Sequence, residues 1–201
     1  MKLHIALLVM GILTQNLVLS KFLGISPFTE KTDSLKEAVR VSLALFPVML
    51  LSTAVTYPLN IILNKLSVQF LGTLVCIIAV VATAAVLIAI TKKLSESTYK
   101  KHKDLIPFIM TNCAVFGLVL LNSRNADAFA DYGFLHSITF ALAAAAGFLL
   151  AMVLFTGVKS KIDSEYLPEC LRGTPITLIS ASVVSLAFSG FAGLAENIGL
   201  I

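Results

Sequence analysis

Charged residues are scarce in this chain of 201 residues, at 13% of the sequence, whereas soluble domains carry roughly 25%. Hydrophobic residues make up 58% of the chain, and its mean hydropathy is +0.95. This balance argues against a water-soluble enzyme, a disordered tail and a nucleic-acid-binding domain, even though the net charge is +4. The composition predicts an all-α integral membrane protein.

Groups that carry catalysis are also few. The three cysteines are too few for a disulfide framework and show no CxxC spacing. None of the three histidines has a carboxylate or a second histidine at ligand spacing. The sequence contains no nucleophile–base pair, no phosphate-binding loop and no cofactor fingerprint, so it does not indicate a catalytic protein.

Six apolar segments are long enough to cross a bilayer, which needs about 20 residues per helix. We expect the first to remain as a membrane helix and not to be removed as a secretory signal. The second contains Pro47 and Pro58, and the fourth is short and has Thr111 and Asn112 at its centre. The six segments run approximately from Leu3 to Ile25, Val39 to Leu63, Val68 to Ile90, Leu105 to Leu121, Phe134 to Val158 and Pro175 to Ala195.

The distribution of lysine and arginine predicts the orientation. Twelve of the fifteen cations lie in the first, third and fifth connections, and only Lys2, Lys65 and Arg124 lie elsewhere. Cytoplasmic connections carry the excess of lysine and arginine. The chain is therefore predicted to be a multi-pass protein of the bacterial or archaeal cytoplasmic (inner) membrane, with both termini outside.

Three spans in each half are the setting for an inverted repeat. We predict one membrane domain made of a first three-helix repeat over residues 1–97 and a second over residues 98–201. The sequences QNLVL at 15–19 and TNCAV at 111–115 are similar short segments, one in each half. Both place an asparagine in a span that contains small or polar residues, so we expect the first and fourth helices to be broken near the bilayer midplane.

Several polar residues have two interpretations that the residues themselves leave open. Asn16 and Asn112 either bind a ligand or hydrogen-bond between helices. Asp127 and Asp131 form either an ion-entry vestibule or a solvated loop. Cys113 follows a helix break, and it is either a ligand or a small packed side chain. No carboxylate lies deep within a span, which argues against a proton relay inside this chain by itself.

Three motifs resemble those of one family. They are NLVLSKFLGISPF at 16–28, IPFIMTNCAVFG at 106–117, and LRGTPITLI at 171–179 followed by LAFSGF at 186–191. Their order and length resemble the RnfA/RsxA subunit of the Rnf ion-translocating electron transport complex, within the NqrE/RnfA family. The resemblance spans nearly the whole chain without large insertions.

The resemblance implies a membrane electron-transfer subunit of an Rnf-type ferredoxin:NAD oxidoreductase complex. Such a subunit is a non-catalytic relay in a redox-driven translocase that couples electron transfer to Na⁺ or H⁺ movement. It pairs with an RnfE-like homologue, and the two hold a [2Fe–2S] cluster between them. The other implied partners are Rnf subunits of the B, C, D and G types together with membrane lipid. The lysines of the segment from Thr91 to Asp104 themselves leave two interpretations open: a contact for an acidic partner or anionic lipid headgroups, or a solvated positive-inside anchor.

The same resemblance assigns the site residues. Cys113 matches the family cysteine of Thr-Asn-Cys-Ala, and Ser26 stands where the family has cysteine in Gly-Ile/Leu-Cys-Pro-Phe. Cys113 and Ser26 are therefore the candidate metal ligands. The residues expected to shape the cofactor site around them are Asn16, Gly24, Ile25, Pro27, Thr111 and Asn112.

Serine at position 26 matters because thiolates are the normal ligands of such clusters, and a serine must lose a much less acidic proton to bind iron. Three outcomes are open: weak ligation by Ser26, a three-thiolate site with another fourth ligand, or no cluster. We favour a retained cluster with altered ligation. The alternatives are a small secondary transporter built on the inverted repeat and a scaffold subunit of the same complex without the cluster.

Overall fold

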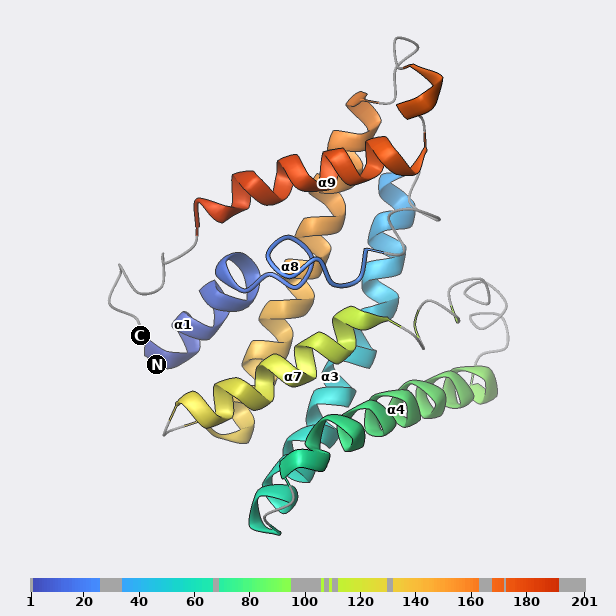
Figure 1. Ribbon diagram of the computed structural model, residues 1–201. Helices are drawn as coiled ribbons and strands as arrows, with labels where there is room; N and C mark the ends of the chain where they lie inside the picture. The colour runs from blue at the N-terminus through green and yellow to red at the C-terminus, as the bar shows by residue number, and fades with distance from the viewer. Residues whose placement is uncertain are drawn as a thin grey trace. The chain divides into compact units, whose positions relative to one another are not determined.

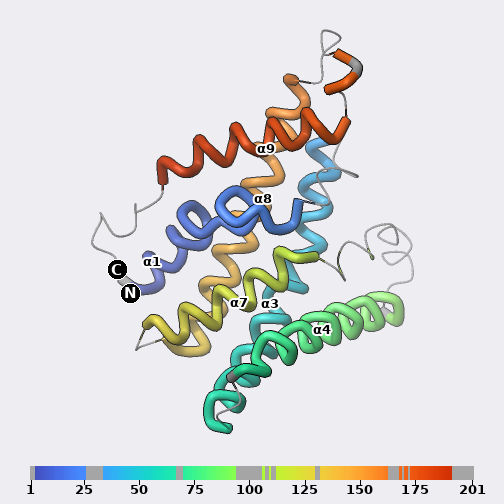
Figure 2. Tube along the Cα trace, in the orientation of Figure 1, coloured from blue at the N-terminus to red at the C-terminus, as the bar shows by residue number. Residues whose placement is uncertain are grey.

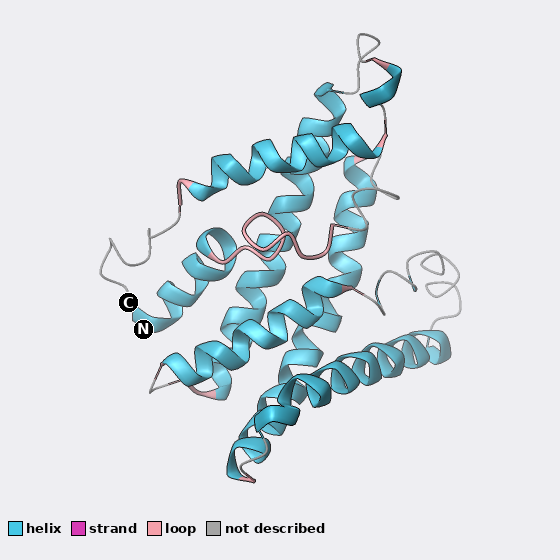
Figure 3. Ribbon diagram, in the orientation of Figure 1, coloured by secondary structure: helices cyan, strands magenta, loops and turns pink. Residues whose placement is uncertain are grey.

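The computed structural model describes residues 2–25, 34–66, 69–94, 112–129, 132–162, 168–171 and 173–191, together with Ile106 and Ile109. Within these residues the chain forms helices and no strand (Figure 3). In chain order they are α1 (Lys2–Val9), η1 (Met10–Thr14), α3 (Leu35–Lys65), η2 (Gln69–Leu71), α4 (Gly72–Leu94), α7 (Cys113–Ala128), α8 (Phe134–Ile162), η4 (Glu169–Leu171) and α9 (Thr174–Ser189) (Figure 1). The predicted all-α membrane class is confirmed.

Three helices are long and apolar enough to cross a membrane: Leu35–Lys65, Gly72–Lys93 and Phe134–Ile162. Helix α3 runs without interruption through both Pro47 and Pro58, as the sequence predicted. Two further apolar helices, Leu3–Thr14 and Thr174–Ser189, are shorter. The first of these stops at the predicted break.

The fourth predicted span differs from the helix that is observed. We expected a helix from Leu105 to Leu121, whereas α7 begins at Cys113 and continues to Ala128. The extension past Leu121 is polar, and hydrogen bonds from outside the segment support it. Asn122 Nδ2 donates to Ser137 Oγ at 2.5 Å, and the Tyr132 hydroxyl donates to Asn122 Oδ1. The apolar run by itself therefore places the end of the helix too early.

Hydroxyl side chains within the helices mostly bond back to the preceding turn. Ser42, Thr156 and Ser180 each donate to the carbonyl four residues earlier, at 2.8–2.9 Å. Polar groups in a bilayer must find partners inside the protein, and this back-bonding supplies them locally. These hydroxyl groups therefore have hydrogen-bond partners within the protein and need no contact with water.

The chain divides into two compact units. Figure 2 follows the Cα trace from the N-terminus to the C-terminus. Unit 1 comprises Met1–Leu43 and Ala143–Ile201, and unit 2 comprises Ala44–Leu142. In unit 1 the first helix crosses α8 at very short range, because a Cβ added at Gly11 would lie 2.6 Å from Ala143 Cβ. Small residues at such crossings let membrane helices approach closely.

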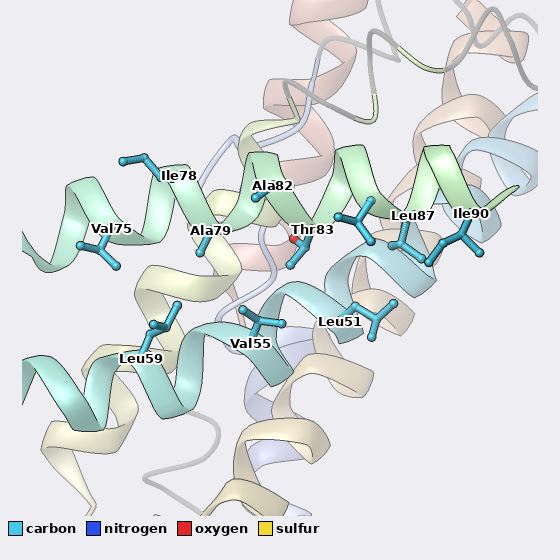
Figure 4. A pocket seen from close by; sticks show the side chains of 11 residues that line it. Leu51, Val55, Leu59, Val75, Ile78, Ala79, Ala82, Thr83, Leu87 and Ile90 are labelled. Carbon is cyan, nitrogen blue, oxygen red and sulfur yellow. The ribbon is translucent and has the colours of Figure 1, made fainter. Parts of the chain in front are cut away.

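In unit 2, α3 and α4 border an apolar hollow of about 600 Å³ (Figure 4). Leu51 and Val55 of α3 face Thr83, Ala79 and further apolar residues of α4 across it (Figure 4). Thr83 is tied to α3 through a 2.8 Å hydrogen bond between its hydroxyl and that of Ser52. The hollow thus has an almost wholly apolar wall, as expected for a surface in contact with hydrocarbon.

Candidate functional site

The first helix is interrupted at Gln15. Helix α1 passes into the π-helical turn η1, where the Gln15 N–H donates to the Met10 carbonyl at 2.7 Å. The chain leaves helical geometry at Gln15, with φ −108° and ψ 34°. Such π-turns are rare and often lie at functional sites. The predicted break is therefore present, and a turn of widened helix precedes it.

Asn16 organises this break. It is wholly buried, and its Nδ2 donates to the carbonyls of Ile12 and Gly147, both at 2.9 Å. Its Oδ1 accepts from the N–H groups of Val18 at 3.0 Å and Leu19 at 3.2 Å. An asparagine amide has two donors and two acceptor lone pairs, so all of them are used within unit 1. The Asn16 side chain therefore stabilises the backbone conformation at the break.

The segment after Asn16 forms one helical turn and then reverses. Phe22 and Gly24 both lie in the left-handed region, with φ 54° and 78°, and the Leu23 N–H returns to the Leu17 carbonyl at 2.8 Å. A left-handed aromatic residue costs on the order of 1–3 kcal/mol, and such strain is found at functional sites. This strained turn leads directly to Ile25, which is half-buried.

Contacts from other parts of unit 1 hold the reversing turn. The Ser185 hydroxyl of α9 donates to the Leu19 carbonyl at 2.5 Å, and the Ser20 hydroxyl donates to the Thr14 carbonyl at 3.0 Å. Backbone carbonyls that the break releases are thus partly satisfied by hydroxyl groups. Ser26 and Pro27, which follow, lie outside the described residues.

The second break comes directly before α7. Asn112 is extended, with φ −73° and ψ 113°, and its Oδ1 accepts from the Ala114 N–H at 2.8 Å. This is the N-cap interaction that asparagine makes at the start of a helix. Asn112 is buried, while Cys113, the first residue of α7, is exposed. Thr111 lies outside the described residues.

The two asparagines make the same local hydrogen bond, because each side-chain oxygen accepts from the N–H two residues later. The sequence similarity between residues 15–19 and 111–115 therefore corresponds to the same hydrogen bond from the backbone to an asparagine side chain. Asn16, Gly24 and Ile25 lie on the segment of the first break in unit 1, and Asn112 and Cys113 lie at the second break in unit 2. The structure describes each group within its own unit.

Cys113 is an exposed residue at the N-terminal end of α7. The N-terminal end of a helix carries a partial positive charge, and this charge favours a negatively charged ligand. Among the described residues, no group of three histidine, cysteine, aspartate or glutamate side chains could hold a metal ion. Any cluster bound at Cys113 therefore needs ligands beyond the described residues of this chain.

The other two cysteines are placed differently. Cys76 is buried between α3 and α4, and its Sγ donates to Asn60 Oδ1 at 3.7 Å. Cys170 is exposed on the short helix η4. Neither shares the capped helix start that surrounds Cys113, so the structure distinguishes the three cysteines by their backbone setting.

Sequence reasoning missed the residues that brace the first break. A Cβ on Gly147 would lie 2.6 Å from the Gly11 carbonyl oxygen and 3.1 Å from Asn16 Nδ2. Gly147 ends a run of four alanines in α8, Ala143 to Ala146. Such a run of small residues is a signal for close helix approach, and it could have indicated this contact.

Comparison with known proteins gives a consistent result. The family described as "Rnf-Nqr subunit, membrane protein" matches residues 4–195. The A-type subunit of the Na(+)-translocating ferredoxin:NAD(+) oxidoreductase complex of Acetobacterium woodii is 37% identical over 191 residues, which are 94% of this chain and 97% of that protein.

Two further relatives are named as A-type subunits of an ion-translocating oxidoreductase complex. The protein of Syntrophotalea carbinolica is 35% identical over 195 residues, and that of Serratia proteamaculans is 36% identical over 194 residues. Each alignment covers 96% of this chain and 98% of the relative. The family resemblance carried by the three sequence motifs is thus confirmed.

Proposed function

The chain belongs to the Rnf-Nqr family of membrane subunits, and we propose that it is the A-type subunit of a redox-driven, ion-translocating oxidoreductase. In this proposal it is a non-catalytic electron relay. It helps to hold an iron–sulfur cluster of the [2Fe–2S] type at an interface with a homologous RnfE-like subunit. Other Rnf subunits supply the electron donor and acceptor sites.

One observation carries the proposal: Cys113 is an exposed thiol at the capped start of α7. Helix N-termini favour thiolate ligands, and exposure leaves the sulfur accessible to a cluster shared with a second chain. This donor fits an iron–sulfur cluster, because iron in such clusters is bound by cysteine thiolates. A cluster bound there supplies one-electron transfer.

The remaining ligands define what the partner must contribute. Clusters of this kind take four protein ligands, and this chain offers Cys113 and, by family position, Ser26. The RnfE-like partner then contributes two cysteines. Ser26 binds iron as an alkoxide or leaves that position to another ligand. Either arrangement changes the charge donated to the iron, which is one of the factors that set the reduction potential.

The rest of the site positions these ligands. Asn16 and Asn112 hold the two helix breaks through their side-chain oxygens. Gly24, with φ 78°, permits the turn toward Ile25, Ser26 and Pro27.

The proposal includes location and cargo. The chain lies in the cytoplasmic membrane with both termini outside, as its cation distribution predicts. The relative from Acetobacterium woodii is named for Na⁺ translocation, so we assign this complex a cation cargo, Na⁺ or H⁺. The chain contributes part of the path by which electron transfer and cation movement are coupled.

Ser26 is the specific observation in favour of a second function. If that serine marks the loss of a ligand, the chain is a scaffold that keeps the fold and the helix breaks but holds no cluster. The electron-relay and scaffold functions differ in a single measurable property, the dependence of bound iron on Cys113.

The test is iron and acid-labile sulfide quantitation, with electron paramagnetic resonance, on the anaerobically purified complex. Cys113→Ala is compared with Cys170→Ala, a matched loss of an exposed thiol on another segment. The relay function predicts that Cys113→Ala removes one reduced-cluster signal from an assembled complex and that Cys170→Ala keeps it. Ser26→Cys is expected to shift the g-values or the potential of the same signal. If Cys113→Ala leaves every signal unchanged, the relay function is wrong and the scaffold function holds.

A further inference from the structure

Unit 2 contains a polar pocket of about 160 Å³ at one end of α3 and α7. Tyr57, Asn60 and Asn64 lie three and four residues apart on α3, so they form one stripe along the helix. Asn122 and Asp127 of α7 line the opposite wall. In a chain with 13% charged residues, polar side chains gathered between two membrane helices mark a candidate ion pathway.

The floor of the pocket is a buried hydrogen-bond network. The Tyr132 hydroxyl donates to Asn122 Oδ1, and Asn122 Nδ2 donates to Ser137 Oγ. The Tyr57 hydroxyl donates to the Tyr132 carbonyl at 3.1 Å. Asn122 is 3% exposed and Tyr132 is 8% exposed. Because one Nδ2 proton of Asn122 points to Ser137, the carboxamide is oriented, and its oxygen keeps a second lone pair available.

The mouth of the pocket is exposed and carries negative potential. Asn64 and Asp127 are exposed, and each is the penultimate residue of its helix, since α3 ends at Lys65 and α7 ends at Ala128. Two helix C-termini, with their partial negative charge, therefore border the mouth together with the Asp127 carboxylate. Lys65, which follows Asn64, and Arg124, three residues before Asp127, are not among the lining residues.

We propose that this pocket is a binding site for a partly hydrated monovalent cation, with Asn64 and Asp127 at its mouth and Asn122 and Tyr132 at its floor. Amide, phenol and carboxylate oxygens are suitable ligands for hard cations, and unwound or terminal carbonyls of helices bind Na⁺ in membrane transporters. The volume holds a few water molecules, at roughly 30 Å³ each. By the predicted topology the pocket opens on the outer face.

This inference rests on the proposed function in one respect: the cation is the one that the complex translocates. The pocket then is the outer station of the path, where the cation exchanges with bulk water. Asn60 also accepts from Cys76, so it is not a suitable position for a test. Asn64 and Asp127 have no such structural role, and both sit at the rim.

The experiment measures equilibrium binding of ²²Na⁺ to the detergent-purified complex, with iron content determined on the same samples. The variants are Asp127→Asn, Asn64→Ala and the double variant. Glu37→Gln is the matched control, because Glu37 is an exposed carboxylate in the first turn of α3, outside the pocket. We expect Asp127→Asn to weaken one Na⁺ site about fivefold, the effect of one unit charge at contact distance in water. The double variant should weaken it further, and Glu37→Gln should not change it.

A second measurement covers the case in which the double variant fails to assemble. Asn64→Cys is labelled with a neutral maleimide, and mass spectrometry follows the modified peptide with Cys170 as the internal control. Saturating Na⁺ should slow labelling at position 64 and not at Cys170. Unchanged Na⁺ affinity in the double variant, or labelling at position 64 that ignores Na⁺, overturns the inference. Because iron is measured separately, the two proposals fail in different ways. A missing Na⁺ site with a normal cluster leaves the proposed function standing. An intact Na⁺ site without a cluster overturns the relay function and leaves the inference standing.

Discussion

Gly147 is the position at which one added methyl group tests how the first helix break is held. Its Cβ would lie 2.6 Å from the Gly11 carbonyl oxygen and 3.1 Å from Ile12 Cα. Both atoms belong to backbone, so neither can rotate away. The same substitution separates the Gly147 carbonyl from Asn16 Nδ2, now at 2.9 Å. Gly147→Ala is therefore expected to force α8 and η1 apart.

The expected cost has two parts. Overpacking of a tight interior costs about 1–3 kcal/mol, and a lost hydrogen bond inside a membrane protein averages about 0.6 kcal/mol. Together they lower the free energy of unfolding by about 1.6–3.6 kcal/mol, and the midpoint of thermal unfolding by roughly 3–14 °C for a chain of this size. Size-exclusion chromatography of the detergent-solubilised protein after heating reports that midpoint.

Gly157→Ala is the control, because it lies in the same helix and its added Cβ would meet no atom within 4 Å. Replacing glycine by alanine at such a helical site stabilises by about 0.5–1 kcal/mol. The two variants should thus move the midpoint in opposite directions. If Gly147→Ala is as stable as Gly157→Ala, the close crossing of η1 and α8 is refuted, and with it the account of how Asn16 is positioned.

Two further predictions concern the asparagines. Asn16→Leu removes four hydrogen bonds and should lower the free energy of unfolding by about 2 kcal/mol. Asn16→Asp places a carboxyl oxygen against the Ile12 and Gly147 carbonyl oxygens at a buried site, which is costly, so a denaturant titration should find it no more stable than Asn16→Leu. Asn112→Ala removes the cap of α7, so it should lower the free energy of unfolding by about 1 kcal/mol and reduce the amount of bound iron. Asn112→Ser keeps a capping oxygen and should retain more iron. Equal iron retention in both variants would show that the cap does not position Cys113.

The fold could be predicted to a large extent because three of the described helices, α3, α4 and α8, are apolar runs of bilayer length, and that signal is local. The two breaks were also predictable, since asparagine within a span is costly unless it is bonded, and both asparagines cap the segment that follows them. The end of α7 was not predictable in this way. Residues 122–128 are polar, and their hydrogen-bond partners Tyr132 and Ser137 lie in the next segment.

The polar pocket could not be predicted from the sequence either. The sequence places Asn60 and Asn64 at the end of a span and Asp127 in a connection, and it does not show that α3 and α7 bring these residues to one cavity. The alanine run before Gly147 could have indicated a close helix approach, but it could not identify Asn16 as the partner, because Asn16 lies 131 positions away. The division into repeats over 1–97 and 98–201 stays a prediction, as do the orientation and the pairing of Ser26 with Cys113.

The two proposed sites place different demands on the same chain. The iron site requires breaks in apolar helices, and these are built from groups that are fully bonded within the protein: Asn16 uses all four of its hydrogen-bonding positions. The cation site requires exchange with water, and its rim residues Asn64 and Asp127 are exposed. A rigid frame suits a cluster, because a fixed environment holds its reduction potential constant. A rim of exposed oxygens suits a cation that must bind and leave in each cycle. Any coupling between the two sites therefore requires a third element that changes with the charge of the cluster.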